Sequence, residues 1–396
     1  MLLRILLITF LEQVSTTALR PMVSYRALEF GADPLGLGLV AAAFGLLSMV
    51  ASLLGGSWVD RWAERRVSVA GALVMAAGCG MVLAADSVVL LALSQAAVGL
   101  GQSMVIIASQ SLLARRNRGA DGGYGVYAAV ASAGQFIGPL AATVLATRLA
   151  PGLGLAGAGS GPTTGSQLVF AGSVLAALLV GVVSATMPAP APAAPGARPG
   201  HPPRRAVFAS VLRLPLMRHA IVCSALLNSS ADILITYLPA YGNARGWSVQ
   251  FVGMLLSARA LGSFAARIFT GPLLVRLGRQ RVLLLSLGLP AAALLVFVLV
   301  PTGAVPAVTL MAVIGFWLGL GVPVTMHWIA QIAPGGLLAN AIGLRLAGNR
   351  FTQFFLPAAA GALAGVAGLA AIFVAMAGLL TTSSVALAVA RQRDSG

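Results

Sequence analysis

The sequence predicts an all-α polytopic membrane protein with twelve transmembrane helices in two pseudo-symmetric six-helix bundles. Its 396 residues are 59% hydrophobic and only 9% charged, which is too apolar for a typical water-soluble domain. Apolar runs of about 20 residues, long enough to cross a roughly 30 Å hydrocarbon core, recur along almost the whole chain. These runs do not alternate at every second residue, so the pattern disfavours a membrane β-barrel.

The expected helices follow one another along the chain with short polar segments between them. The first run carries Glu12 and has no small-residue cleavage site after it, so we interpret it as a helix and not as a signal peptide. The twelve expected spans are residues 3–25, 35–57, 67–86, 88–113, 124–148, 165–187, 216–241, 249–273, 281–300, 305–332, 338–362 and 366–390.

The placement of the basic residues predicts the orientation of these helices. The net charge is +16, and all 25 basic residues are arginines. If the even-numbered loops are cytoplasmic, seventeen arginines lie on that side and about four on the other, which is the positive-inside pattern. We therefore expect both termini in the cytoplasm and no nucleic-acid partner. High Ala, Gly and Arg contents are typical of GC-rich bacterial genomes, so we expect a bacterial cell inner membrane.

An extended segment rich in Pro, Ala and Arg divides the chain. We expect an N-terminal six-helix bundle at 1–187, a cytoplasmic linker at 188–215 and a C-terminal six-helix bundle at 216–396. The bundles are internal copies. A shift of 215 residues aligns Gly31 with Gly246, Gly38 with Gly253, Ser48 with Ser263, Gly56 with Gly271, Arg61 with Arg276 and Arg66 with Arg281, and a shift of 218 aligns Gln135, Phe136 and Pro139 with Gln353, Phe354 and Pro357.

The segment Gly56-x-x-x-Asp60-Arg61-x-x-x-Arg65-Arg66 resembles the loop between helices 2 and 3 of the major facilitator superfamily (MFS). Residues 271–281 resemble its second copy, between helices 8 and 9. The resemblance implies the MFS fold, with a substrate path between two halves that alternate in access. The sequence departs from the family pattern at three positions: Ala63 replaces a glycine, Val275 replaces an acid, and Gln95 replaces the helix 4 arginine that the family associates with proton coupling.

The two loop copies are expected to form a cytoplasmic gate. Asp60 ends helix 2 on the side where helix 11 begins, and a helix N-terminus stabilises a nearby carboxylate by about 0.3 to 2 kcal/mol. The alternative for the arginines is that they only fix the topology, to which acidic residues contribute little. The expected gate residues are Gly56, Asp60, Arg61, Arg65, Arg66, Gly271, Arg276 and Arg281.

Helix 5 contains the sequence Gly134-x-x-x-Gly138-Pro139, which resembles the kink motif of the family's drug and proton antiporters and favours export. Glycines four residues apart allow close helix packing, and proline bends a helix. Packing without any antiporter-specific role is the alternative. The expected partner is helix 8, whose small residues at the same spacing are Ala258, Gly262 and Ala266.

Ionisable side chains at membrane depth cost about 2.5 to 3.5 kcal/mol or more, so each is a candidate functional residue. Polar residues recur at i, i+4 and i+8 in four spans: Glu12, Thr16 and Arg20; Asn228, Asp232 and Thr236; Arg259, Ser263 and Arg267; Arg345, Asn349 and Gln353. We expect Glu12 and Asp232 to couple transport to protons, because a buried carboxyl can take up and release a proton and an arginine cannot. Arg20, Arg267 and Arg345 lie near helix ends and are expected to snorkel.

Arg259 and Arg350 lie nearer the midplane, where they could hold the deprotonated carboxylates or bind an anionic group of a substrate. Buried ion pairs that only hold the bundle together are the alternative for all four midplane charges. A purely structural role is the alternative for His327. The other expected residues of the substrate cavity are Asn228, His327, Gln135, Gln102 and Tyr127.

The sequence therefore predicts a secondary active transporter that exports a small organic molecule across the inner membrane, coupled to protons. Uptake of an anionic metabolite, and a non-transporting sensor or assembly protein of the same fold, are the alternatives. The sequence contains no nucleophile elbow, phosphate-binding glycine loop or metal-ligand cluster, so we expect no catalysis, no cofactor and no metal. We expect a monomer in the lipid bilayer.

Overall fold

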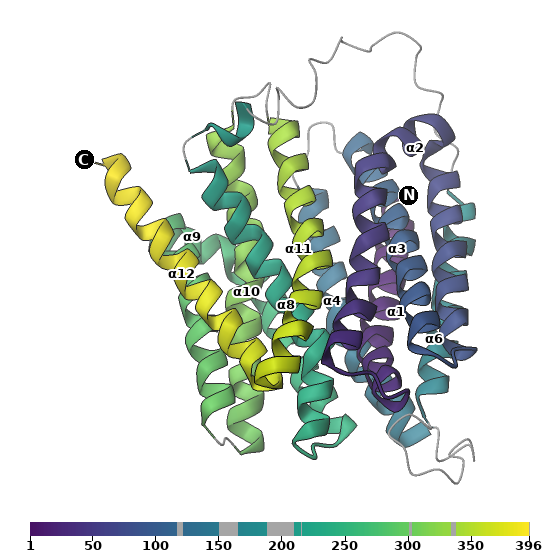
Figure 1. Cartoon of the computed structure of the whole chain (residues 1–396). Helices are drawn as coiled ribbons and strands as arrows, with labels where there is room; N and C mark the ends of the chain where they lie inside the picture. Colours follow the sequence, from purple (N-terminus) through teal and green to yellow (C-terminus); the bar gives the residue numbers. More distant parts are fainter. Residues whose placement is uncertain are drawn as a thin grey trace.

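The computed structural model describes residues 1–116, 122–149, 165–187, 210–214, 216–300, 303–333 and 338–395. These residues form a bundle of long helices that run side by side (Figure 1). Most of the predicted linker at 188–215 lies outside the described residues. The helices are α1 (Leu2–Glu29), α2 (Pro34–Leu83), α3 (Val88–Arg116), α4 (Gly122–Val144) with a π-helical turn at Leu145–Leu149, α6 (Ser166–Ala185), α8 (Met217–Ala244), α9 (Val249–Leu299), α10 (Ala304–Ile332), α11 (Leu338–Ala367) and α12 (Leu369–Ser395).

Helices α2 and α9 each contain two membrane spans that are joined at a kink. The kinks lie at Ala63 (φ 65°, ψ 152°) and at Gly278 (φ 73°, ψ 153°), which are one 215-residue repeat apart. The sequence predicted loops between these spans, but the helix continues up to each kink and resumes after it. We call this end of the bundle the kink end, and the opposite end, with the turns at residues 30–33 and 245–248, the turn end.

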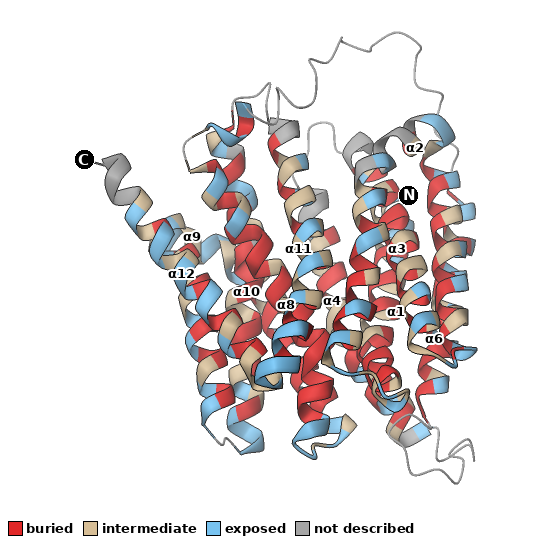
Figure 2. Cartoon of the chain, viewed as in Figure 1, coloured by how far each residue is buried: buried red, intermediate tan, exposed pale blue. Residues whose placement is uncertain are grey.

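The predicted all-α membrane fold is confirmed. Ten described segments are long and apolar enough to cross a membrane, and α9 contains two of the predicted spans within one such segment. Helix α11, packed against α2 and α8, completes the predicted set of twelve spans. Large apolar side chains are exposed, for example Leu175 (59% exposed) and Val182 (62% exposed) on α6. Figure 2 shows exposed positions along the outer helices of the bundle. Such a surface fits contact with lipid.

The two turns at the turn end are also copies of each other. Gly31 and Gly246 have positive φ values of 73° and 70°, which only glycine adopts without strain. The helix that follows each turn begins at a capping side chain, Asp33 or Ser248, which accepts a backbone N–H hydrogen bond at 2.7 Å or 3.1 Å. The repeat seen in the sequence is therefore a repeat of backbone structure.

Two symmetric seams join the halves near the turn end. In the first seam, α2 packs against α11, and a Cβ atom on Gly38 would clash with the carbonyl group of Pro357. The hydroxyl group of Tyr237 donates to the same carbonyl at 2.7 Å. In the second seam, α4 packs against α9, where Gly253 meets the side chain of Thr143. Because Gly38 and Gly253 are equivalent in the repeat, the seams are copies of one contact.

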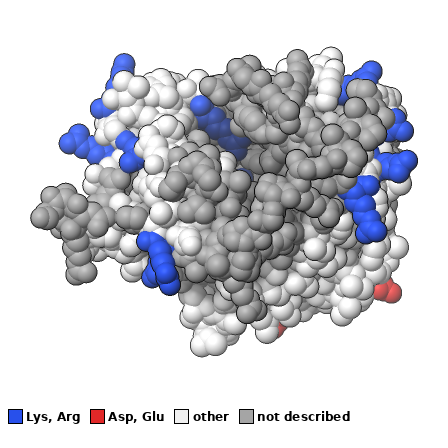
Figure 3. Space-filling model, turned by 90° about the horizontal axis from the view of Figure 1, so that it is seen from above, with Lys and Arg blue, Asp and Glu red and all other residues white. Residues whose placement is uncertain are grey.

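The kink end is strongly basic. Figure 3 views the bundle from this end and shows arginine side chains around the face; the acidic side chains drawn in red, among the described residues, lie at its margin. Arginine atoms also lie in a recess near the middle of the face. The exposed arginines at this end include Arg61, Arg65, Arg66, Arg276 and Arg281.

Candidate functional site

Helix α1 presents a row of polar side chains where the halves meet. Glu12 and Thr16 lie one turn apart on the same face, and Glu12 is only 1% exposed. The carboxylate of Glu12 accepts hydrogen bonds from the side-chain amides of Gln13, at 3.1 Å, and of Gln102 on α3. The Gln102 amide also donates to the hydroxyl oxygen of Thr16 at 3.1 Å. Glu12 is thus held by neutral amide groups.

The amide network extends to α4, where Gln135 donates to the side-chain oxygen of Gln13 at 3.1 Å. Among the described residues no cation lies within ion-pair distance of Glu12. Gln102 and Gln135, which the sequence assigned to the substrate cavity, are therefore brought to Glu12 or its neighbour. The sequence reasoning missed Gln13, although a polar residue beside a glutamate in an apolar span could have indicated it.

Asp232 on α8 forms an ion pair that joins the halves. Its Oδ1 atom lies 2.6 Å from the Nη1 atom of Arg20 on α1, and both side chains are about nine-tenths buried, at 10% and 11% exposed. Oδ2 accepts from Gln353 at 3.1 Å, and Asn228 lies 3.5 Å away. The guanidinium of Arg20 also lies over the ring of Phe44. The prediction that Arg20 snorkels is wrong, because its counter-charge on the other half draws it inward.

Two further arginines complete the centre, from the second half. Arg350 on α11 donates to the side-chain oxygen of Gln353 at 2.6 Å, and its charge interacts with those of Asp232 and Glu12. Arg259 on α9 is 6% exposed and interacts with the charge of Asp232. Its buried Nε atom has no hydrogen-bond partner in the described part of the chain. The charged centre thus contains three arginines and two carboxylates.

The other predicted cavity residues lie apart from these contacts. His327 on α10 is exposed, and its ring nitrogen pairs with Gln331 one turn along at 2.9 Å. Tyr127 on α4 packs in a small apolar cluster with residues such as Ile5 and Ile8 of α1. The described contacts therefore do not link either residue directly to Glu12 or Asp232.

The predicted gate is only partly described. The backbone of Gly56 and Asp60 belongs to α2, but the surroundings of both residues and residues 334–337 before α11 lie outside the described part of the chain, and so does the expected contact of Asp60. The structure instead picks out Glu64, which the sequence reasoning missed. Glu64 is fully buried beside the kink and accepts a hydrogen bond from Ser111 of α3 at 3.0 Å. This hydrogen bond joins the kink of α2 to α3, within the first half.

The glycines of helix 5, which is α4 in the structure, pack against a different helix from the one predicted. A Cβ atom on Gly134 would lie 2.7 Å from Cβ of Gln13, and one on Gly138 would clash with Thr17, so both glycines face α1. Gly262 on α9 instead packs against the backbone of α10 near Ala312. Helix 8, the first span of α9, packs against α4 through the second seam, but the expected pairing of these glycines with Ala258, Gly262 and Ala266 is wrong. Small residues at one spacing define a face without defining its partner.

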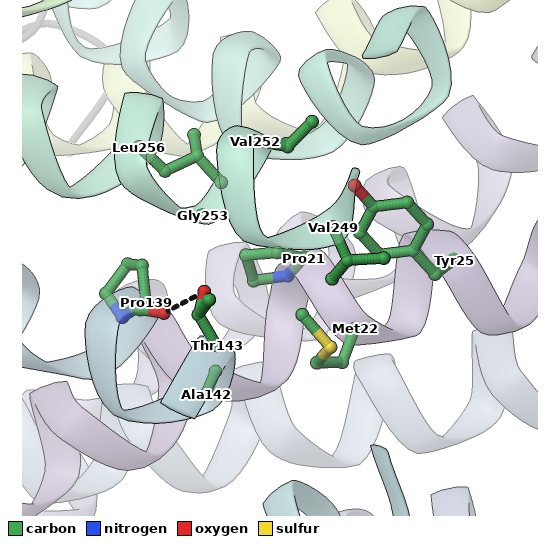
Figure 4. A pocket seen from close by; sticks show the side chains of 10 residues that line it. All are labelled: Pro21, Met22, Tyr25, Pro139, Ala142, Thr143, Val249, Val252, Gly253 and Leu256. Carbon is green, nitrogen blue, oxygen red and sulfur yellow. Dashed lines mark hydrogen bonds between the residues drawn. The ribbon is translucent and has the colours of Figure 1, made fainter. Parts of the chain in front are cut away.

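A narrow apolar crevice lies beside the second seam (Figure 4). Its walls come from α1, α4 and α9, with Tyr25, Pro139, Val252 and Gly253 among the lining residues. Thr143 donates its hydroxyl hydrogen to the carbonyl oxygen of Pro139, one turn back on the same helix, at 2.9 Å. No charged residue lines the crevice, so it is a packing feature of the seam and separate from the charged centre.

The chain can also be compared with known proteins. A search of curated proteins finds no match. Similar solved structures include the nucleoside transporter NupG (14% identity, TM-score 0.77, covering 98% of this chain and 98% of that chain). The peptide transporter POT in complex with sulfate is similar at 18% identity, with a TM-score of 0.73 and coverage of 99% and 94%. A bacterial homolog of the human lysosomal transporter Spinster, in an inward-facing and occupied conformation, is similar at 16% identity (TM-score 0.74, 99% and 96%).

At these identities the structural likenesses show the fold alone. The family model is more specific, because it matches residues 5–252 and 220–396 and so spans nearly the whole chain. Together with the duplicated six-helix units and the paired kinks, this match identifies the chain as a member of the Major Facilitator Superfamily.

Proposed function

We propose that this protein is a proton-coupled secondary transporter that moves a small organic molecule by alternating access between its two halves. The observation that carries the proposal is the setting of Glu12. This carboxylate is buried at membrane depth, is held by the amides of Gln13 and Gln102, and interacts with the charge of Arg350 on the other half.

The setting of Glu12 gives protonation a mechanical consequence. A charged side chain at membrane depth costs about 2.5 to 3.5 kcal/mol or more, and protonation of a carboxylate removes that cost. Ionised Glu12 attracts Arg350 and so draws the two halves together, whereas protonated Glu12 exerts no such attraction. The proton occupancy of one carboxyl thus biases the arrangement of the halves, which is what coupling requires.

Asp232 supplies a second control point. Its ion pair with Arg20 lies between the halves, on the turn-end side of Glu12. In the proposed cycle this pair holds the turn end closed, and the recruitment of Asp232 by other donors lets the turn end open. We place the kink end in the cytoplasm, since arginines gather there.

Two directions of transport have support from different observations. The sequence Gly134-x-x-x-Gly138-Pro139 resembles the kink motif of drug and proton antiporters and supports export. The excess of arginine at the centre supports a second candidate, uptake of an organic anion together with a proton. An anion beside Arg350 takes the place of ionised Glu12 as its counter-charge, so the anion binds best when Glu12 is protonated. The anion and the proton then move in the same direction.

Purified protein in proteoliposomes that contain a pH-sensitive dye tests the proposal. We expect organic cations such as ethidium, or organic anions such as benzoate and salicylate, to move protons across the wild-type membrane. Glu12→Gln keeps the size of the side chain and should abolish this coupling. Glu29→Gln, at a carboxylate in a solvent-side pair with Arg26 near the turn end, is the matched control and should retain it.

The sign of the pH change separates the two directions of coupling, since exchange and joint uptake move protons oppositely relative to the substrate. Proton movement that is the same in Glu12→Gln as in the wild type would refute the assignment of Glu12. Substrate flux that ignores an imposed pH gradient would refute proton coupling itself.

A further inference from the structure

We infer that the transported molecule carries an anionic group, a carboxylate or a phosphate, and that this group binds between Arg259 of α9 and Arg350 of α11. The inference rests on the transport function proposed above and specifies its substrate class.

The first observation is the charge balance at the centre. Arg20, Arg259 and Arg350 face two carboxylates, Glu12 and Asp232, so one positive charge is left over. The ion pair with Asp232 occupies Arg20 at 2.6 Å. Protonation of Glu12 would raise the excess to two positive charges. An anion is the ligand whose charge corrects this imbalance.

The second observation is that, within the described part of the chain, both remaining arginines use few of their hydrogen-bond donors. A guanidinium carries five N–H donors. Arg350 donates to a neutral amide oxygen of Gln353, and Arg259, 6% exposed, has a buried Nε–H without a partner in the described part of the chain. A buried charged donor without a hydrogen-bond partner costs free energy, so a ligand that accepts hydrogen bonds from these arginines recovers that free energy on binding. Forked guanidinium donors match carboxylate and phosphate oxygens.

The third observation is that two further arginines lie on the kink-end side of this pair. Arg267 lies two turns beyond Arg259 on α9 and donates to the carbonyl oxygen of Ala128 on the opposite half. Arg345 lies on α11, on the kink-end side of Arg350, and is 4% exposed beside the sulfur of Met326. The described spans contain no carboxylate along either stretch. These two charges make the potential on the kink-end side of the pair more positive, which favours anions over cations.

Ligand binding to the purified protein in nanodiscs tests the inference. The probes are benzoate with benzamide, which is uncharged and has the same shape, and phenyl phosphate with benzyl alcohol, which is an uncharged aryl compound. We expect at least one anion to raise the thermal unfolding temperature of the wild type while its neutral partner does not. Arg259→Gln and Arg350→Gln should each weaken anion binding by about ten- to a hundredfold. Arg4→Gln, at an exposed arginine at the start of α1, is the control and should bind as the wild type does.

A measurement without any ligand tests the same point independently. If Arg259 awaits an anion, its attraction to Asp232 does not offset the cost of its burial in the empty protein, and Arg259→Met should raise the unfolding temperature. Arg20→Met removes a paired arginine and should lower it. A lowered unfolding temperature in Arg259→Met would assign that arginine a structural role and overturn the inference. Equal stabilisation of the wild type by the anions and by their neutral partners would overturn it as well.

The two proposals fail in different ways. Proton-coupled movement of neutral or cationic compounds alone would leave the transport function standing and overturn the anion site. Arginine-dependent binding of anions without any flux in proteoliposomes would leave the site standing and overturn the transport function.

Discussion

The ion pair between Arg20 and Asp232 makes a quantitative prediction about the closed turn end. The two atoms are 2.6 Å apart and both side chains are about nine-tenths buried, so removing one partner leaves the other charge buried and uncompensated. Breaking such a pair costs about 3 to 5 kcal/mol. A cost of about 3 kcal/mol corresponds to roughly a hundredfold change in the population of the closed arrangement.

Replacing both partners, in Arg20→Gln with Asp232→Asn, leaves neither charge uncompensated and should recover most of this loss. We expect an interaction energy of about 1 to 3 kcal/mol in the double-mutant cycle. The sign of this interaction energy tests the reasoning more directly than its size. Each single variant should open the turn end more than the double variant does.

Spin labels at Leu35 of α2 and Val366 of α11 report this opening, since both residues are exposed and lie close to the first seam. The buried cysteines Cys79 and Cys223 are first replaced by alanine. Distance distributions should be longest in the single variants. Single variants that stay as closed as the wild type, or a double variant that opens further than either, would refute the reasoning.

Further predictions concern the backbone of the repeat. Ala63→Gly should stabilise the protein by about 1 kcal/mol, because φ 65° with ψ 152° is a glycine conformation that strains alanine. Gly278→Ala should destabilise it for the same reason. Thermal unfolding in detergent measures both, and a destabilised Ala63→Gly with a stabilised Gly278→Ala would contradict the strain. Gly253→Ala should reduce transport because the added Cβ meets the side chain of Thr143, and Thr143→Ala in the same protein should restore it. Flux in proteoliposomes measures both. A Gly253→Ala variant that transports normally would show that transport does not need close packing at the second seam.

The sequence predicted those features of the fold that depend on local chemistry and on the repeat. The shift of 215 residues aligns the two kinks, at Ala63 and Gly278, and the two positive-φ turns, at Gly31 and Gly246. Backbone geometry at such positions is set by neighbouring residues, so equivalent sequence gives equivalent structure. The departure at Ala63 was visible in the sequence as a missing glycine, and its positive φ explains why the family has glycine there.

The partners of the polar residues could not be predicted in the same way. Helical spacing places Glu12 and Arg20 on one face of α1, but it does not say which helix that face meets. The structure pairs Arg20 with Asp232, 212 residues away, and turns the Gly134 face toward α1 and not toward the expected helix 8. These contacts depend on how whole helices pack, which a single sequence with uniformly apolar spans does not specify.

The central claim is that the protonation of Glu12 sets the balance between the two arrangements of the halves. Two spin-label pairs test it most directly: Leu35 with Val366 at the turn end, and Arg61 with Arg276 at the kink end, measured at about pH 5 and about pH 9. Glu12 lies roughly 12 Å nearer the kink end than Arg20 does, from the helical rise over eight residues. As the pH rises, ionised Glu12 should draw the halves together there, so the kink-end distance shortens and the turn-end distance lengthens.

The same measurement on Glu12→Gln is the decisive comparison, because this variant keeps the amide contacts and cannot ionise. The account predicts that its two distances no longer respond to pH. Distances that change together in the wild type, or a pH response that survives unchanged in Glu12→Gln, would contradict it.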